Sequence, residues 1–231
     1  AKAARRSSFS FGLEEEIMDT QFNDIRNALQ LLRESGAAES VFGAEKHNFL
    51  VNPRLSEREV IEFERTHGIS LPADYRAFLI EVGNGGAGPA YGLFKLGEMD
   101  NGFDEGPWGD FVGLLAKPFP HTSAWNDASG MPIFDDSWEN TEREDQYERE
   151  YEAWERRYWD TEKVNGAIPI CHLGCAVRQW LVVTGPERGN VWNDCRTDQE
   201  GLEPVQSGGR DRVTFIDWYR RWLDEALKTN Q

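Results

Sequence analysis

The residues best suited to chemistry in this chain are three cysteines and four histidines. They include one compact group similar to a metal-binding motif, Cys171-His172-Leu173-Gly174-Cys175, with Cys195 further along the chain. Structural zinc takes four Cys or His ligands, and its cysteine pairs favour a C-x-x-C spacing. Here three residues separate Cys171 from Cys175, and Cys171 and His172 would point to opposite faces of an extended strand. We therefore predict buried structural cysteines, no metal site and no other cofactor.

Catalysis by a cysteine would also need a histidine and an orienting group brought together in space. No local signature surrounds His47, His67, His121 or His172, and His67 lies on the apolar stripe of a predicted helix. Acidic pairs such as Asp135-Asp136 arise from composition alone in a chain with 41 acidic residues. The sequence therefore predicts no catalytic residue and a protein that is not an enzyme.

The glycine-rich run from Gly83 to Gly88 is the other motif that could bind a ligand. It follows a predicted helix rather than a strand, and it lacks the Gly-Lys-Ser/Thr ending of a phosphate-binding loop. We interpret it as the end of a helix that leads into a turn.

The charge balance indicates the class of partner. The chain carries 25 basic and 41 acidic residues, a formal net charge of −16. Nucleic acids and anionic membranes attract basic surfaces, so this composition argues against both. An acidic face accelerates encounter with a basic protein. The alternative is that the charge serves only solubility.

The composition also bears on location. No apolar run approaches the roughly 20 residues that span a bilayer. The segment Ala1–Ser10 lacks the apolar stretch of a secretory signal. Three cysteines suit a reducing compartment better than a disulfide framework. We therefore expect a cytoplasmic protein.

Hydrophobic periodicity predicts helices around residues 14–35, 55–68 and 72–82. Ser56 and Glu59 form a capping box at the start of the second of these helices. A densely charged helix is predicted for residues 139–162, with an aromatic stripe expected to pack on the domain: Tyr147, Tyr151, Trp154 and Tyr158.

Strands are predicted at residues 91–96, 167–170 and 178–184. A five-residue loop joins the last of these strands to Val191-Trp192 as a hairpin, and residues 197–212 are interpreted as a loop. Thr214 and Asp217 cap a final helix. Helices and strands do not alternate regularly, so a doubly wound parallel sheet is not indicated.

Several of these segments resemble the SUKH superfamily, in particular its branch named after a fungal cell-wall synthesis regulator (SMI/KNR type). The resemblance is carried by a capped helix, a Gly-Ile-x-Leu-Pro step, an aromatic helix and an Asn-Gly-Gly turn. Those features are Leu55-Ser56-Glu57 through Glu64, Gly68 through Pro72, Ala73 through Leu79, and Asn84-Gly85-Gly86. The later strands and the helix 215–227 agree in outline.

The resemblance implies an α+β fold with a central, mostly antiparallel or mixed sheet flanked by helices. Residues 13–231 would form a single domain after a flexible tail at residues 1–12, and the charged helix at about 139–163 would be an insertion. Bacterial members of the superfamily are regarded as immunity proteins that bind and block toxins, many of them nucleases. Fungal members act as interaction hubs. Neither group is known for catalysis.

We therefore interpret the chain as a non-enzymatic protein-binding module, an immunity protein that neutralises a basic bacterial toxin domain. The oligomeric state stays open. A regulatory or scaffold module of the same fold is the alternative, and an unrecognised hydrolase is the least favoured. The expected partner-binding surface comes from residues 98–138 and the charged helix, and the expected partner-binding residues are Tyr91, Trp108, Trp125, Asp135, Asp136 and Trp138. Their aromatic side chains would equally serve as core residues.

Overall fold

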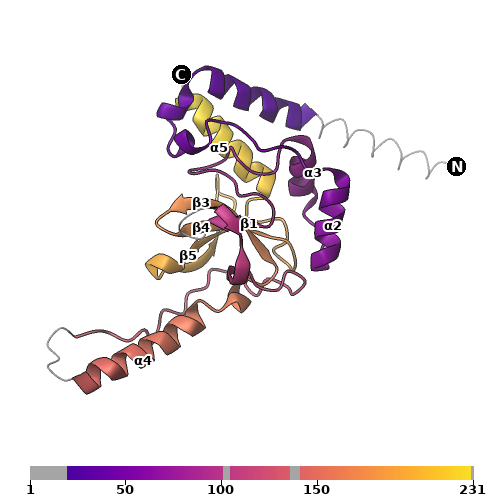
Figure 1. The fold of residues 1–231 in the computed structure, drawn as a ribbon. Helices are drawn as coiled ribbons and strands as arrows, with labels where there is room; N and C mark the ends of the chain where they lie inside the picture. The colour runs from indigo at the N-terminus through magenta and orange to yellow at the C-terminus, as the bar shows by residue number, and fades with distance from the viewer. Residues whose placement is uncertain (1–19, 101–104, 136–140, 230–231) are drawn as a thin grey trace.

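The computed structural model describes residues 20–100, 105–135 and 141–229 (Figure 1). The predicted tail at residues 1–12 and the start of the predicted first helix lie outside these ranges. Within them, no helix combines the length and the apolar character needed to cross a membrane.

The centre of the molecule is a four-stranded antiparallel sheet in the order β3-β4-β5-β6. Its strands are β3 (Ala167–Gly174), β4 (Val177–Val182), β5 (Val191–Cys195) and β6 (Gly201–Pro204). A separate antiparallel pair consists of β1 (Glu98–Asp100) and β2 (Glu105–Pro107). The predicted α+β class with an antiparallel sheet and the β4–β5 hairpin are confirmed.

Two strand predictions are wrong. Residues 197–212 were expected to form only a loop, but they contain β6. The sequence gives little sign of this edge strand, because it is only four residues long and includes the exposed Glu203. Residues 91–96 make only isolated bridges, in which Leu93 pairs with Gly86 and Cys171.

Helices lie on one side of the sheet and, in the case of α4, project from it. The long helices are residues 20–34, α2 (Glu57–His67), α3 (Ala73–Glu81), α4 (Thr141–Tyr158) and α5 (Phe215–Thr229). Short 3₁₀ turns connect them: η1 (Ala37–Glu39), η2 (Ala44–Lys46), η3 (Gly109–Phe111), η4 (Thr161–Val164) and η5 (Arg196–Asp198).

Local sequence signals explain the start and the end of α2. The Ser56 side chain accepts a hydrogen bond from the Glu59 amide, and the Glu59 carboxylate accepts one from the Ser56 amide. This capping box satisfies two amides that the helix itself leaves unpaired. At the other end, Gly68 adopts φ 65°, which favours glycine over other residues.

One face of the sheet packs against helices. Leu181, Val183 and Val191 belong to a large buried cluster with side chains of helix 20–34, α2, α3 and α5. The Trp218 indole of α5 donates a hydrogen bond to Gln179 of β4 over 3.2 Å, so α5 lies directly on this face. Figure 1 shows these helices gathered on one side of the sheet. We call it the helix face.

The opposite face carries the alternate side chains of the same strands. Trp180, Val182, Trp192 and Leu202 form a smaller cluster with residues of the surrounding loops, Phe119 and Val164. No long helix lies flat over this cluster within the described ranges, and turns and loops cover it instead. We call it the loop face.

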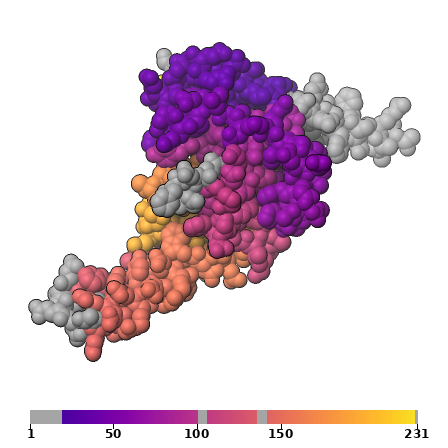
Figure 2. Space-filling view, viewed as in Figure 1, coloured from indigo at the N-terminus to yellow at the C-terminus, as the bar shows by residue number. Residues whose placement is uncertain are grey.

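Helix α4 leaves the loop face at a steep angle and projects from the body as an arm (Figures 1 and 2). At the base of the arm, Trp154 and Tyr158 are buried and stack on each other with ring centroids 4.8 Å apart. Tyr147 and Tyr151, further out, are half-buried. The predicted packing of the aromatic stripe on the body therefore holds for its last turn, while further out Tyr147 packs edge-on against Phe134 of the preceding segment.

Candidate interaction site

Among the described residues, the partner-binding residues predicted from the sequence do not lie together on one surface. Tyr91 packs edge-on against Phe42 and lies 5.6 Å from the ring of His172. The Trp108 ring packs instead against Phe63 and His67 of α2.

Trp125 is held more firmly than the other two. Its backbone exchanges hydrogen bonds with Leu202 of β6, and its ring stacks on Tyr158 at 5.6 Å. Asp135 is exposed and follows Phe134, whose ring contacts Tyr147 of α4. Asp136 and Trp138 lie outside the described residues. Tyr91, Trp108 and Trp125 are thus half-buried side chains with internal neighbours, each in a different part of the fold.

The prediction of buried cysteines holds for Cys171 alone, because Cys175 is exposed and Cys195 is half-buried. Cys171 is buried, which raises the pKa of its thiol far above the ordinary value, so the thiolate is strongly disfavoured. Its Sγ lies 3.2 Å from the carbonyl oxygen of Pro89. The adjacent His172 instead places Nδ1 3.1 Å from the Asp100 carboxylate. Within the described ranges, no cluster of three or more His, Cys, Asp or Glu side chains is placed to hold a metal ion.

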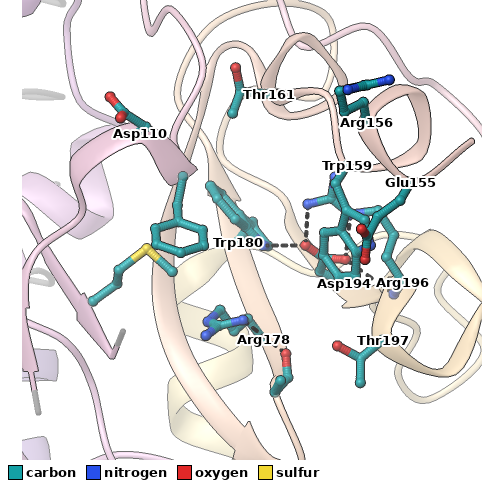
Figure 3. Close-up of a pocket in the computed structure, with 13 residues that line it drawn as sticks. Asp110, Glu155, Arg156, Trp159, Thr161, Arg178, Trp180, Asp194, Arg196 and Thr197 are labelled. Atoms are coloured by element: carbon teal, nitrogen blue, oxygen red, sulfur yellow. Dashed lines mark hydrogen bonds and ion pairs between the residues drawn. The ribbon is translucent and has the colours of Figure 1, made fainter. Parts of the chain in front are cut away.

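The structure forms a different candidate site where the cover of the loop face ends. There, a pocket of about 630 Å³ opens between the sheet and the base of α4. Its lining comes from six parts of the fold: β1, η3, the last turn of α4 with Trp159 and Thr161, the β3–β4 turn, β4, and the β5–η5 junction (Figure 3). We call it the aromatic–arginine pocket.

Strand alternation explains why charged and apolar side chains share its floor. Arg178, Trp180 and Val182 occupy alternate positions of β4, so they point to the same face of the sheet. Val182 lies in the loop-face core, Trp180 at its margin and Arg178 in the pocket. On β5, Asp194 pairs in register with Arg178.

Asp194 and Arg196 form a buried ion pair in the floor, each with 4% of its side chain exposed. Arg196 Nε donates to Asp194 Oδ1 over 2.8 Å, and Nη2 donates to Oδ2 over 2.6 Å. The Trp180 indole donates to the same Oδ2 over 3.1 Å, as Figure 3 shows. This bidentate geometry fixes the carboxylate and the guanidinium in one orientation.

Of the two arginines in the pocket floor, Arg196 has a carboxylate partner, whereas Arg178 has only backbone acceptors among the described residues. Its Nη1 and Nη2 donate to the backbone carbonyls of Ala176 and Asp100 over 3.0 and 3.1 Å. Burial lowers the pKa of Arg178 below its ordinary value, and the nearby Asp100 and Asp194 counteract this effect. At neutral pH a guanidinium still carries its charge. Arg178 is therefore a cation that is partly removed from water without a direct salt bridge among the described residues.

Two aromatic side chains of the lining are exposed to solvent. Phe111 of η3 is 55% exposed, and Trp159 at the end of α4 is 37% exposed. Phe111 and Trp159 line the pocket itself. Gly113, which follows η3, lets this segment approach η4 closely, since a Cβ at this position would lie 2.4 Å from the carbonyl oxygen of Thr161. The Arg196 guanidinium lies 4.7 Å from the centre of the Trp159 ring and supports it from the protein side.

Sequence reasoning missed this pocket. The available signal was a charged residue two positions from a buried aromatic residue on the same strand: Arg178 before Trp180 on β4, and Asp194 after Trp192 on β5. Alternation places each pair on one strand face, and a charge there predicts either a buried ion pair or a ligand site. Phe111 and Trp159 lie far from these strands in the sequence, and no sequence pattern indicated that they would line the same pocket.

Comparison with known proteins agrees with the resemblance noted in the sequence. No significant match was found among curated proteins or among solved structures. Residues 54–207, about two thirds of the chain, match the SMI1 / KNR4 family (SUKH-1). This range includes α2, α3, the arm and the whole four-stranded sheet. The chain therefore belongs to the SMI1 / KNR4 family (SUKH-1).

Proposed function

We propose that this protein is a non-enzymatic immunity protein that neutralises a basic bacterial toxin domain by binding it at the aromatic–arginine pocket. Membership of the SMI1 / KNR4 family supports a protein-interaction or immunity-type module in general. The toxin, its basic character and the use of this pocket are our proposal.

The observation that carries the proposal is the pair of exposed aromatic side chains, Phe111 and Trp159, in a pocket whose floor is fixed by the buried Asp194–Arg196 ion pair. Soluble proteins seldom gather large apolar side chains at their surface unless a partner covers them. Interface residues that contribute most to binding are enriched in tryptophan, tyrosine and arginine and lie around desolvated centres. Phe111, Trp159, Trp180 and Arg178 provide this combination in one place.

Charge supports a basic partner. The net charge of −16 creates an acidic field around the molecule. Helix α4 contributes to that field with seven acidic and four basic side chains, and it ends beside the pocket. Glu155 and Asp110, both exposed, bring carboxylates to the pocket margin. A basic toxin domain would be steered toward this side of the molecule.

The test uses the toxin domain encoded next to the gene of this protein. We expect the two proteins to co-purify, and cells that express the toxin to survive when this protein is present. Trp159→Ala should weaken the complex by about 2 kcal/mol, roughly 30-fold, because it truncates an aromatic anchor. The matched control is Leu31→Ala, which truncates a 58% exposed side chain on helix 20–34, far from the arm in Figure 1.

The outcomes separate the alternatives. Equal affinity of the Trp159→Ala and Leu31→Ala proteins would show that the pocket is not the docking site. Absence of any complex with a neighbouring toxin, together with binding to a host protein, would replace the immunity role with the regulatory or scaffold role.

A further inference from the structure

The polar groups in the floor of the aromatic–arginine pocket are directed into the protein. Asp194 accepts hydrogen bonds from Arg196 and from the Trp180 indole, and these bonds use its lone-pair positions. Arg178 Nε and Arg196 Nη1 are closed to solvent, so a ligand does not reach them. The two outer nitrogens of Arg178 already donate to backbone carbonyls. A group that enters the pocket therefore gains little from hydrogen bonds to the floor.

The walls offer apolar surface instead. Phe111 is 55% exposed and Trp159 is 37% exposed, and both side chains line the pocket. Met99 and Trp180 lie deeper and are almost fully buried. Covering apolar surface contributes roughly 25 cal/mol per Å², whereas a charged group would lose its hydration without a new partner. The lining therefore favours an uncharged apolar group.

The size of the pocket suits an inserted side chain. Its volume of about 630 Å³ is within the range of clefts that hold small organic groups. Residues that anchor protein–protein complexes are commonly large side chains inserted into such depressions, where they lose contact with water. The pocket is therefore large enough for one bulky side chain of a partner.

The rim adds a preference for a positive charge beside the apolar group. Asp110 and Glu155 line the pocket and are exposed. Neither carboxylate forms an ion pair or a hydrogen bond with another described residue. Arg156 is the exposed guanidinium among the described lining residues, so one carboxylate is in excess. A lysine or arginine of the partner would complement that charge.

We propose that the aromatic–arginine pocket receives one uncharged apolar side chain of the toxin partner, and that a lysine or arginine beside it on the partner faces Asp110 and Glu155. This proposal rests on the proposed function and refines it by naming the chemistry of the group that enters. The occupant is a segment of a basic protein, in agreement with the net charge of −16. Its apolar side chain inserts, and its cation stays at the rim.

The first experiment needs no toxin and uses three N-acetylated dipeptide amides that differ in one side chain. Phenylalanyl-lysine carries both features, alanyl-lysine lacks the ring, and phenylalanyl-glutamate reverses the charge. Each is titrated against the full chain while NMR follows the indole N–H signal of Trp159, assigned by its loss in Trp159→Phe. We expect a saturable shift with phenylalanyl-lysine. Affinity should be about tenfold weaker without the ring and about threefold weaker with the reversed charge.

A filling variant tests whether the probe binds inside the pocket. Thr197 of η5 is exposed and lines the pocket, so Thr197→Trp would occupy the space with an indole ring. This variant should lose about tenfold in affinity for phenylalanyl-lysine. Asp198→Trp is the matched control, because Asp198 is the next residue of η5 and does not line the pocket. The comparison of the three probes on the unaltered protein decides the matter even where a variant fails to fold.

Three results would overturn the proposal: no shift of the Trp159 signal with millimolar phenylalanyl-lysine, equal affinity for phenylalanyl-lysine and alanyl-lysine, or undiminished binding by a folded Thr197→Trp protein. Equal affinity for the lysine and glutamate probes would overturn the basic neighbour.

Toxin binding by the same variants separates this proposal from the proposed function. If Trp159→Ala weakens the toxin complex but the probes do not bind, the docking site stands and the apolar side chain as its occupant fails. If the probes bind but the Thr197→Trp protein binds the toxin as before, the apolar preference of the pocket stands and docking of the toxin there fails. Loss of both probe and toxin binding in Thr197→Trp supports both proposals.

Discussion

The two faces of the central sheet bury similar aromatic side chains but differ in what covers them. The helix face lies under α3 and α5 and continues into one large apolar cluster. The loop face lies under turns and loops and ends in an open pocket. Regular helices can close a face completely, because their apolar stripes match it along several turns. Irregular cover leaves gaps, and here the gap exposes charged and aromatic groups.

The largest expected effect lies on the helix face. Phe215→Ala removes a fully buried ring that packs edge-on against Tyr75 and Phe78. It should lower the free energy of unfolding by about 3–5 kcal/mol, because the surrounding helices cannot collapse into the space. Urea denaturation monitored by circular dichroism measures this change. A loss below 1 kcal/mol would mean that the helix face is not the principal core.

An effect of nearly the same size is expected in the loop face, from a different cause. Asp194→Ala leaves the Arg196 charge and the Trp180 indole without their acceptor, which should cost about 3–5 kcal/mol. Replacing the ion pair by apolar side chains, Asp194→Leu with Arg196→Met, should recover most of this loss. Denaturant unfolding of the single and double variants compares them. A double variant no more stable than Asp194→Ala would show that the pair contributes more than compensation of buried charge.

The contrast between the faces is sharpest for Trp159. We expect Trp159→Ala to lower the free energy of unfolding by only about 0.5–1 kcal/mol, since its ring is partly exposed and, among the described residues, makes ring contacts only with the Arg196 guanidinium and the edge of Tyr158. The same variant should bind the proposed toxin domain much more weakly than the unaltered protein. Parallel unfolding and affinity measurements test this separation. A stability loss as large as that of Phe215→Ala would assign Trp159 to the core.

The smallest expected effect is a dependence of stability on pH. Burial is the main cause that lowers the pKa of all four histidines below 6.5: His47, His67, His121 and His172. Below pH 6.5 the unfolded chain therefore binds protons more readily than the folded chain, and the free energy of unfolding falls with falling pH.

Unfolding in urea at pH 7.5, 6.5 and 5.5 measures this slope, and His121→Gln should reduce it. The comparison stays above pH 5.5 because burial raises the pKa of Asp74 from 3.8, which acts in the opposite direction in more acidic solution. Stability that is constant or rises toward pH 5.5 would contradict the prediction.

The sequence predicts the helix face well. Capping at Ser56 and the stripe Tyr75, Phe78 and Leu79 are local signals, and the structure contains both. The antiparallel hairpin of β4 and β5 was equally readable from two apolar runs and a glycine-containing loop. These elements depend on interactions between residues close in sequence.

The pocket depends on long-range placement, which no local pattern encodes. Phe111 and Trp159 line the same pocket although they lie far apart in the sequence, and the chain after η3 passes close to Thr161 at Gly113. The partner residues predicted from the sequence were chosen by residue type, which does not encode where each one lies. Trp125, for example, pairs through its backbone with Leu202 at the sheet edge, and its ring stacks on Tyr158.

The arm has a mechanical consequence. A helix of 18 residues is about 27 Å long, and its last turn ends beside the pocket. A small change of tilt at Tyr158 therefore moves the far end of the helix by several ångströms, and a pull on the far end acts on Glu155 and Trp159 at the base. A partner that binds both the far end of α4 and the pocket would fix the tilt of the helix. A partner that binds the far end alone would shift Glu155 and Trp159 and so change the shape of the pocket.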